Sequence, residues 1–408
     1  MKEFIKNYKE NLILMMGHFS ADICQGSVSS ALTVMLAQGV LHSKVEMSYL
    51  VLASTLVSSL IQPVIGYFSD KSPKPYLMSI GILTAALGLM FIGFLENFYL
   101  LFILLTTSGI GVAVFHPQGG KMANCVSVHR KGLGVSIFSV GGNLGFSAGP
   151  IVISAATYWF GLPGIMAIGI PAFIMSFILL AKNRQYVEYT RIEQIKLKKN
   201  SSVEQESYSG FAILTLMIFF RSAVLFALTT YIPSYFMDVY GQNAQTANLN
   251  LSIVAVCSAV ASLAGGILAD RIGFKKVLFY SAVGVAPCML LFTMAPNGII
   301  AVLAMVAVAL SVYGTLSVSM VLGQKFLCRH VGFASGITIG LGISFGGITT
   351  PFYGYIFDHY GAQATMLAVT ATACIAAVIA YFVPDIDAIR AKKALEATEK
   401  SSSSQTAE

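Results

Sequence analysis

The chain has 408 residues, of which 56% are hydrophobic and 11% are charged. An average soluble domain has about 45–50% apolar and about 25% charged residues, so this composition excludes a water-soluble globular protein. The apolar residues form blocks of about twenty, the length with which a helix crosses hydrocarbon roughly 30 Å thick. The composition therefore predicts an all-α membrane protein with many spans.

Motifs that the sequence lacks exclude further classes. It contains no GxxxxGK[ST] phosphate loop, which argues against an ATP-driven pump with its own motor domain. The residues behind the net charge of +7 lie in short loops beside apolar spans, which favours a lipid bilayer over nucleic acid as the partner. We expect no metal site, disulfide framework or cofactor, because the six cysteines are scattered without a CxxC pair: Cys24, Cys125, Cys257, Cys288, Cys328 and Cys374.

The apolar blocks predict twelve transmembrane helices. They lie at 12–39, 47–69, 76–95, 98–120, 132–157, 162–182, 211–237, 246–268, 276–294, 298–323, 332–356 and 362–384. A polar stretch between the two sets of six is interpreted as a solvated linker, and the Ser-rich tail is expected to be disordered. The expected organisation is an N-terminal six-helix bundle at 1–182, a cytoplasmic linker at 183–209, a C-terminal six-helix bundle at 210–384 and a cytoplasmic tail at 385–408.

Lysine and arginine are distributed unevenly between the loops. The N-terminus, the linker, the tail and every second loop are basic, whereas the alternate loops contain only Lys44. Basic loops stay on the cytoplasmic side of a membrane. This pattern predicts a multi-pass membrane protein with cytoplasmic termini. The first apolar block is too long for a signal-peptide core and is expected to be retained as a span.

Two similar loops lie 200 residues apart. GYFSDKSPK at 66–74 aligns with GILADRIGFKK at 266–276, so that Asp70 matches Asp270 and Lys71 matches Arg271. A duplicated six-helix unit explains this offset, and in such proteins the functional cavity lies between the halves near mid-membrane.

These loops resemble the signature loop of the major facilitator superfamily. The second copy matches it better, since the first lacks the second glycine and has Pro73 there. GHFSADICQGS at 17–27, GVAVFHPQGG at 111–120 and SIFSVGGNLGFSAGP at 136–150 together resemble the fosmidomycin resistance group of drug exporters within that superfamily. The resemblance implies two pseudo-symmetric six-helix bundles, transport by alternating access and a phosphonate antibiotic as substrate class.

The first span carries a polar face. His18, Asp22, Gln25 and Ser29 follow one another at steps of four, three and four, which places them on one side of a helix. An ionisable residue inside a span costs about 2.5–3.5 kcal/mol on insertion scales, so it should face water, a partner or substrate. A carboxylate beside an imidazole can exchange a proton near neutral pH, and we assign proton coupling to Asp22 with His18. The alternative is a polar seam that bonds a neighbouring helix, which we favour for Ser29.

Two further spans contribute charged or titratable groups. Arg221, in the seventh span, needs an anion, which is expected to be Asp22 in the resting protein or an anionic group of the substrate. A purely structural pair with Asp22 is the alternative. His116 directly precedes Pro117, whose ring frees a backbone carbonyl, so this histidine either faces the cavity at a kink or bonds that carbonyl. The expected substrate-binding set is completed by Gln25, Tyr231, Tyr235 and Tyr313.

Two groups of residues are expected to govern conformational change. The resemblance places Asp70 opposite the start of the eleventh helix near Gly332 and Asp270 opposite the start of the fifth near Gly132, where free N–H groups favour an anion. Such contacts form only when the halves are closed on the inside. The fifth span carries a glycine motif associated with antiporters of the superfamily, expected to seal the interface between the halves. The expected gate is Asp70, Lys71, Asp270, Arg271, Gly145, Gly149 and Pro150.

These observations predict a secondary active transporter, a proton-coupled antiporter that exports a small anionic or zwitterionic compound. An importer or exporter of a metabolite, nutrient or siderophore-like organic anion on the same scaffold is the alternative. An enzyme is not expected, because no convergent catalytic set is visible. Composition does not separate a carrier from a channel or a non-transporting sensor. Saturable, pH-gradient-dependent flux into proteoliposomes would favour a carrier, whereas ohmic ion current would favour a pore. Protons, a small-molecule substrate and the bilayer are the expected partners of a monomer.

Overall fold

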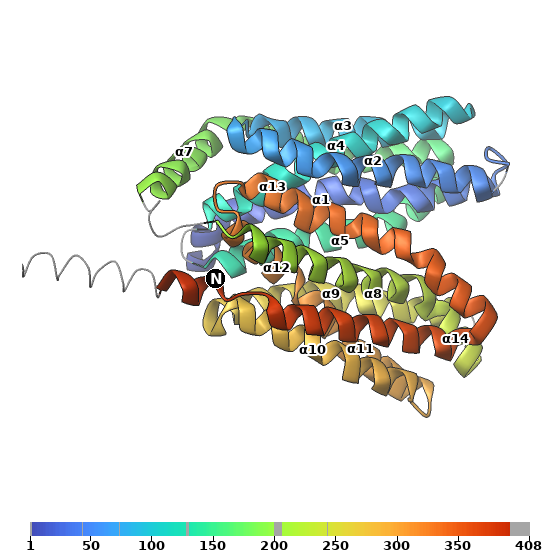
Figure 1. The fold of residues 1–408 in the computed structure, drawn as a ribbon. Coiled ribbons are helices and arrows are strands. Elements are labelled where there is room, and N and C mark those ends of the chain that lie inside the picture. The colour runs from blue at the N-terminus through green and yellow to red at the C-terminus, as the bar shows by residue number, and fades with distance from the viewer. Residues whose placement is uncertain are drawn as a thin grey trace, which may run out of the picture.

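The computed structural model describes residues 2–42, 44–72, 74–127, 130–199, 206–242 and 244–391, and these residues form helices and no strand. The helices run roughly parallel in two groups (Figure 1). One group, the N-terminal half, contains α1 (Lys2–Ala37), α2 (Lys44–Lys71), α3 (Tyr76–Met90), α4 (Phe98–Val126), α5 (Lys131–Phe160) and α6 (Gly169–Ala181), with the short helices η1 (Ile92–Phe94) and η2 (Leu162–Ile168).

The C-terminal half repeats this arrangement with more interruptions. Its tenth span is divided into α11 (Gly298–Gly314) and α12 (Leu316–Phe326). A π-helical turn, η3 (Gly336–Leu341), interrupts the eleventh span. Gly361, with φ of +84°, separates the eleventh span from the twelfth within the last long helix. The elements are α8 (Tyr208–Tyr240), α9 (Ala244–Ile272), α10 (Phe274–Thr293), α11 (Gly298–Gly314), α12 (Leu316–Phe326), α13 (Val331–Ser335), η3 (Gly336–Leu341) and α14 (Gly342–Phe382).

The helices account for the twelve predicted spans. Nine stretches of the described chain are long and apolar enough to cross a membrane, and the last of them, Val331–Ala391, contains two helices that meet at Gly361. α1 and α9, with 36 and 29 residues, supply the other two spans. The predicted all-α fold of two pseudo-symmetric six-helix bundles is therefore confirmed.

The connection between the halves differs from the expected solvated linker in one respect. It contains the helix α7 (Asn183–Lys199). Tyr186 of α7 is buried and contacts Glu10 through its hydroxyl at 3.2 Å, and Glu193 pairs with Lys131 at 3.1 Å. These contacts attach α7 to the N-terminal half at the end where the N-terminus lies (Figure 1). We call this end, with its Lys- and Arg-containing loops, the basic end.

Part of the expected disordered tail is also packed. Asp387 forms an ion pair with Lys325 of α12 at 2.7 Å, and Ile386 is buried. The expectation of disorder from residue 385 is therefore wrong for the first residues of the tail, while residues 392–408 lie outside the described part.

Glycines bring α1 and α5 into backbone contact. A Cβ at Gly145 would overlap the carbonyl oxygen of Phe19, and one at Gly149 would lie 2.6 Å from the backbone nitrogen of Ser27. Phe19 and Ser27 belong to α1, in the same half as α5. The glycine motif therefore packs two helices of one half, and the expectation that Gly145 and Gly149 seal the interface between the halves is wrong. Pro150, one residue further along α5, is exposed.

Candidate transport site

Three polar side chains from α1 and α4 meet inside the N-terminal half. The carboxylate of Asp22 lies 2.8 Å from Nε2 of His116 through Oδ1 and 3.2 Å from Nε2 of His18 through Oδ2. His18 and His116 are buried, with 6% and 1% of their surface exposed. The Asp22 side chain keeps 14% of its surface exposed. We call these residues the His–Asp–His cluster. Its carboxylate is the member most open to the surroundings.

The hydrogen bonds determine where protons can sit in this cluster. Nδ1 of His18 lies 2.8 Å from the carbonyl oxygen of Phe138, which can only accept, so this nitrogen carries a proton. A neutral His18 then presents the lone pair of Nε2 to Asp22, and the two groups repel unless a proton lies between them. Nε2 of His116 can donate to Oδ1 while this ring stays neutral. The geometry therefore fits a cluster with one exchangeable proton shared by Asp22 and His18.

The helix α5 packs against the His–Asp–His cluster and has a glycine where the cluster touches it. Phe138 stacks on His18 with ring centroids 4.1 Å apart, and one turn further along α5 lies Gly142. A Cβ at Gly142 would be 2.5 Å from Cε1 of His18 and 2.7 Å from Oδ2 of Asp22. The absence of a side chain at this position is what allows the imidazole and the carboxylate to lie against α5. Gly142 is not among the site residues that the sequence predicts.

The cluster is also a possible ligand set for a divalent transition metal. Two imidazole nitrogens and a carboxylate oxygen lie within 4.8 Å of one another, and imidazole and carboxylate are ligands that such ions accept. The bond from His18 to the Phe138 carbonyl holds the ring in the tautomer that leaves Nε2 free for an ion. The sequence indicates no metal site, because His116 lies 94 residues from Asp22 and the two meet only in the folded protein.

For His116 the structure decides between the two expectations. Its Nε2 contacts Asp22, and its buried Nδ1 has no partner in the described part of the chain, so the ring does not bond the carbonyl freed by Pro117. Gln25, one turn from Asp22 on α1, is half-buried. Because Gln25 shares a helix face with Asp22, it stays a candidate contact for the substrate.

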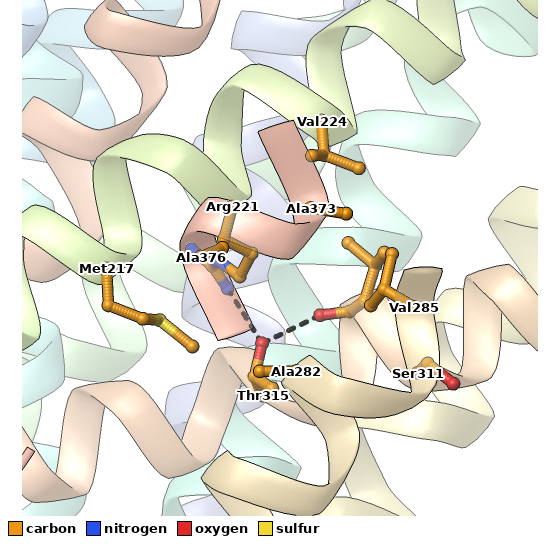
Figure 2. Close-up of a pocket in the computed structure, with 10 residues that line it drawn as sticks. Met217, Arg221, Val224, Ala282, Val285, Ser311, Thr315, Ala373 and Ala376 are labelled. Atoms are coloured by element: carbon orange, nitrogen blue, oxygen red, sulfur yellow. Dashed lines mark hydrogen bonds between the residues drawn. The ribbon is translucent and has the colours of Figure 1, made fainter. Parts of the chain in front are cut away.

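The expected pairing of Asp22 with Arg221 is wrong. Among the described residues Asp22 contacts two histidines of the N-terminal half, while Arg221 donates from Nη1 to Thr315 at 3.5 Å within the C-terminal half. Figure 2 shows Arg221 directed into a small pocket with Met217, Ala282 and Ala373. The physical reason is that α8 turns this side chain toward the interior of its own bundle. The two charges do not share a chamber in this conformation.

The three tyrosines of the expected binding set contact other residues of the C-terminal half. Tyr235 is fully buried, with its hydroxyl bonded to the Thr293 carbonyl at 3.2 Å, so the expectation that it lines a substrate pocket is not met in this conformation. Tyr231 donates to the Thr350 carbonyl at 3.0 Å and stays half-buried. Tyr313 packs at the edge of the same core.

The two signature aspartates connect the halves at the basic end. Asp70 accepts from the backbone N–H groups of Gly332 and Phe333 at 2.9 and 3.0 Å. Asp270 accepts from those of Gly132 and Leu133 at 2.9 and 2.8 Å, so the two contacts are related by the 200-residue offset. Each carboxylate caps the start of a helix in the other half, where free N–H groups favour negative charge. These are the contacts that the sequence predicts, and they close the basic end.

The first glycine of each signature loop permits this approach. A Cβ at Gly66 would overlap the carbonyl of Gly332, and a Cβ at Gly266 would lie 2.5 Å from the carbonyl oxygen of Gly132. The backbones of opposite halves therefore touch one turn before each aspartate. The basic residues that follow, Lys71 and Arg271, are exposed.

Further polar contacts lie at the same end, two of them between the halves and one within the N-terminal half. Asn124 donates to Oε1 of Gln324 at 2.5 Å, and Gln324 donates to the Gly120 carbonyl at 3.1 Å. Lys121 of α4 pairs with Asp70 at 2.8 Å. These three side chains are not recognisable from the sequence, because they lie at predicted helix ends, where polar residues are common.

Comparisons with known proteins agree with this architecture. A sequence model of the Major Facilitator Superfamily matches residues 14–337 and 214–405. The chain is 30% identical over 318 residues to the fosmidomycin resistance protein of Escherichia coli (strain K12), covering 77% of this chain and 78% of that protein. It is 26% identical over 387 residues to the MFS-type transporter YfnC of Bacillus subtilis (strain 168), covering 93% of each.

A solved structure has the same fold. The E. coli fucose:proton symporter FucP is 15% identical and superposes with a TM-score of 0.71, covering 93% of this chain and 99% of that chain. The fold, the signature loops and these relatives define a multi-pass membrane transporter rather than an enzyme. The chain belongs to the major facilitator superfamily, and among its relatives is a fosmidomycin resistance protein.

Proposed function

We propose that this transporter is a proton-coupled antiporter of a bacterial inner membrane, with both termini cytoplasmic, that exports a small anionic or zwitterionic compound by alternating access. The observation that carries the proposal is the His–Asp–His cluster, in which Asp22 and His18 are placed to share one exchangeable proton. The substrate class, a phosphonate antibiotic or a compound like it, is supported by the relative named for fosmidomycin resistance.

The cluster supplies a physical basis for coupling. With the shared proton it is neutral, and without it a net negative charge remains among buried groups, which is costly unless water or a cation approaches. Gain and loss of one proton therefore favour different arrangements of α1, α4 and α5, and a ligand shifts a conformational equilibrium only through such differences. Proton entry and substrate exit then alternate because each requires a different conformation.

The charge of the cluster constrains how a substrate can bind. A deprotonated Asp22 repels an anion and attracts a cation. A zwitterionic substrate would therefore place its cationic group toward Asp22 and its phosphonate away from it, near a neutral donor such as the Gln25 amide. This orientation replaces the expected role of Arg221 as the direct anion partner, since Arg221 faces away from the cluster.

The closed basic end supports the direction of opening. Asp70 and Asp270 hold that end shut, so access to the cluster in this conformation would have to come from the opposite side. In the proposed orientation the opposite side is the periplasm, from which a proton would reach Asp22. Asp70, Asp270 and the exposed Lys71 and Arg271 would then form a cytoplasmic gate.

Replacing Asp22 tests the assignment of the proton site. Asp22→Asn keeps the shape but removes the titrating carboxylate, and we expect accumulation against a gradient to be abolished in proteoliposomes with an imposed pH difference. Glu96→Gln is the matched control, because it neutralises an exposed acid in a loop far along the chain. Gradient-driven transport that persists in Asp22→Asn, with the control unchanged, would eliminate Asp22 as the proton carrier.

Drug-susceptibility profiling identifies the substrate class. Cells with and without the protein would be challenged with phosphonates, lipophilic cations and organic acids, and we expect protection against phosphonates. A second candidate, proton-coupled import, is supported by the fold shared with a fucose:proton symporter. Uptake that rises when the outside is acidified would favour import, whereas uptake driven by an acidic interior, which is the reversed antiport reaction, would favour the antiporter.

A further inference from the structure

Arg221 is a buried charge with little compensation. It lies near the middle of α8 and is 6% exposed. Its Nη1 reaches Thr315 at 3.5 Å, and its buried Nε has no hydrogen-bond partner among the residues that the structure describes. Thr315 already donates to the Val312 carbonyl at 2.8 Å, so it accepts a hydrogen bond from Arg221 without contributing charge. The guanidinium stays protonated in proteins, so its positive charge remains.

The C-terminal half offers this guanidinium no carboxylate. Its acidic residues between positions 208 and 384 are Asp238, Asp270 and Asp358, which lie at or near the ends of spans. None of them forms an ion pair with Arg221 among the described residues. A buried charge without a partner is strongly unfavourable, so a counter-ion is required from outside the chain.

A pocket of suitable size lies beside the guanidinium. Arg221 points into it from α8, with Met217 and Val224 on the same helix, Ala282 on α10 and Ala373 on α14 (Figure 2). The volume of this cavity is about 10 Å³, which holds one water-sized occupant. Its walls are apolar apart from the hydroxyl groups of Ser311 and Thr315, and its size excludes a phosphonate or a larger organic anion.

We propose that this pocket binds one small inorganic anion, of the size and charge of chloride, as the counter-ion of Arg221. The ion neutralises the guanidinium between α8, α10, α11 and α14 and thereby stabilises the packing of the C-terminal half. This site is separate from the His–Asp–His cluster and does not depend on proton coupling.

Anion-dependent stability of the full-length protein tests the proposal. The purified transporter in lipid nanodiscs would be unfolded by heat in sodium gluconate and in sodium chloride or bromide at equal ionic strength. We expect chloride and bromide to raise the unfolding temperature by at least about 2 °C relative to gluconate. In Arg221→Gln this shift should vanish, whereas Arg184→Gln, which changes an exposed arginine of α7, should retain it.

Direct binding covers the case in which Arg221→Gln does not fold. Equilibrium binding of radioactive chloride to the wild-type protein should give about one ion per chain, and inorganic phosphate and methylphosphonate should not displace it. No chloride binding, or a chloride shift that persists in Arg221→Gln, would overturn the proposal. Stabilisation by methylphosphonate with no effect of chloride would also overturn it, because Arg221 would then hold the anionic group of a substrate.

Discussion

At the scale of single residues, the proposed proton site depends on a glycine, Gly142, whose lack of a side chain leaves room for the cluster. The Phe138 carbonyl that fixes His18 also accepts, in an α-helix, from the N–H group four residues on, which belongs to Gly142. Because Gly142 has no Cβ, the imidazole and the Asp22 carboxylate can both approach this turn of α5. One methyl group here would occupy the space of the cluster.

Gly142→Ala should therefore disturb proton coupling without changing any titratable group. The new Cβ must displace His18 or Asp22, and overpacking of this kind costs about 1–3 kcal/mol. We expect pH-gradient-driven transport in proteoliposomes to fall at least about tenfold while the protein stays folded. Gly347→Ala is the matched control, since a Cβ there meets no atom within 4 Å. Equal activity of the two variants would contradict the described packing of the cluster.

The sequence predicts some parts of the site and cannot predict others. The His18 and Asp22 pair is visible because helical periodicity puts residues four apart on one face. The contact with His116 is not, since it joins positions 94 residues apart across two helices. Arg221 was placed correctly inside a span, but the direction of its side chain depends on how α8 is rotated in its bundle, which composition does not determine.

At the scale of elements, the long apolar helices are predictable and their interruptions are not. Hydrophobic blocks reveal the spans because a helix in lipid satisfies its own backbone polar groups. Hydrophobicity does not reveal α7, because its polar sequence is typical of a loop. Its attachment depends on contacts of Tyr186 and Glu193 with the N-terminal half. The π-helical turn η3 likewise leaves no clear pattern in the sequence.

The carboxylate of Glu206 anchors the end of the connection between the halves. Its contribution to the stability of the folded protein should depend on pH. Glu206 accepts from Nδ1 of His330 and from the backbone N–H of Arg329, both at 2.9 Å. Burial raises the pKa of Glu206, but hydrogen bonds from His330, Tyr208 and the backbone of Arg329 lower it more, so that it lies below the usual value of 4.5. A lowered pKa means that the ionised form stabilises the folded protein.

The stabilisation from Glu206 should therefore be complete above about pH 4.5 and decrease as the pH falls through its lowered pKa. We expect Glu206→Gln to unfold at a lower temperature than the wild type at pH 7, with a difference that shrinks below pH 4.5. Glu188→Gln serves as control, because Glu188 is exposed on α7. The measurement is thermal unfolding in detergent across this pH range, and a difference that stays constant with pH would contradict the expectation.

At the scale of the whole molecule, two symmetric contacts hold the basic end closed. They are not equivalent in charge, since Asp70 also pairs with Lys121 at 2.8 Å, whereas the matching position in the other half is Val321. The Lys121 ammonium offsets part of the negative charge of Asp70 in the closed state. Asp270 has no comparable cation from the equivalent position.

Asp70→Asn and Asp270→Asn should each shift the protein toward opening at the basic end. Each carboxylate accepts two backbone N–H bonds, and hydrogen bonds to a charged group are worth about 1.5–3 kcal/mol, or a factor of roughly 10–100 in the conformational equilibrium. We expect slower transport with substrate binding retained, and wider distances across the basic end by spin-label spectroscopy. Unchanged cycling rates in both variants would reject this role.

The contact between Asn124 and Gln324 has a consequence for the symmetry of the two halves. The two residues occupy equivalent positions, so they lie where the internal twofold axis crosses the molecule, and at such a point each residue meets its own copy. An amide is both donor and acceptor and can pair with an identical amide, which two carboxylates or two ammonium groups cannot do. A six-helix unit with an amide at this position could therefore pair with an identical copy of itself across that axis, as the two halves do here.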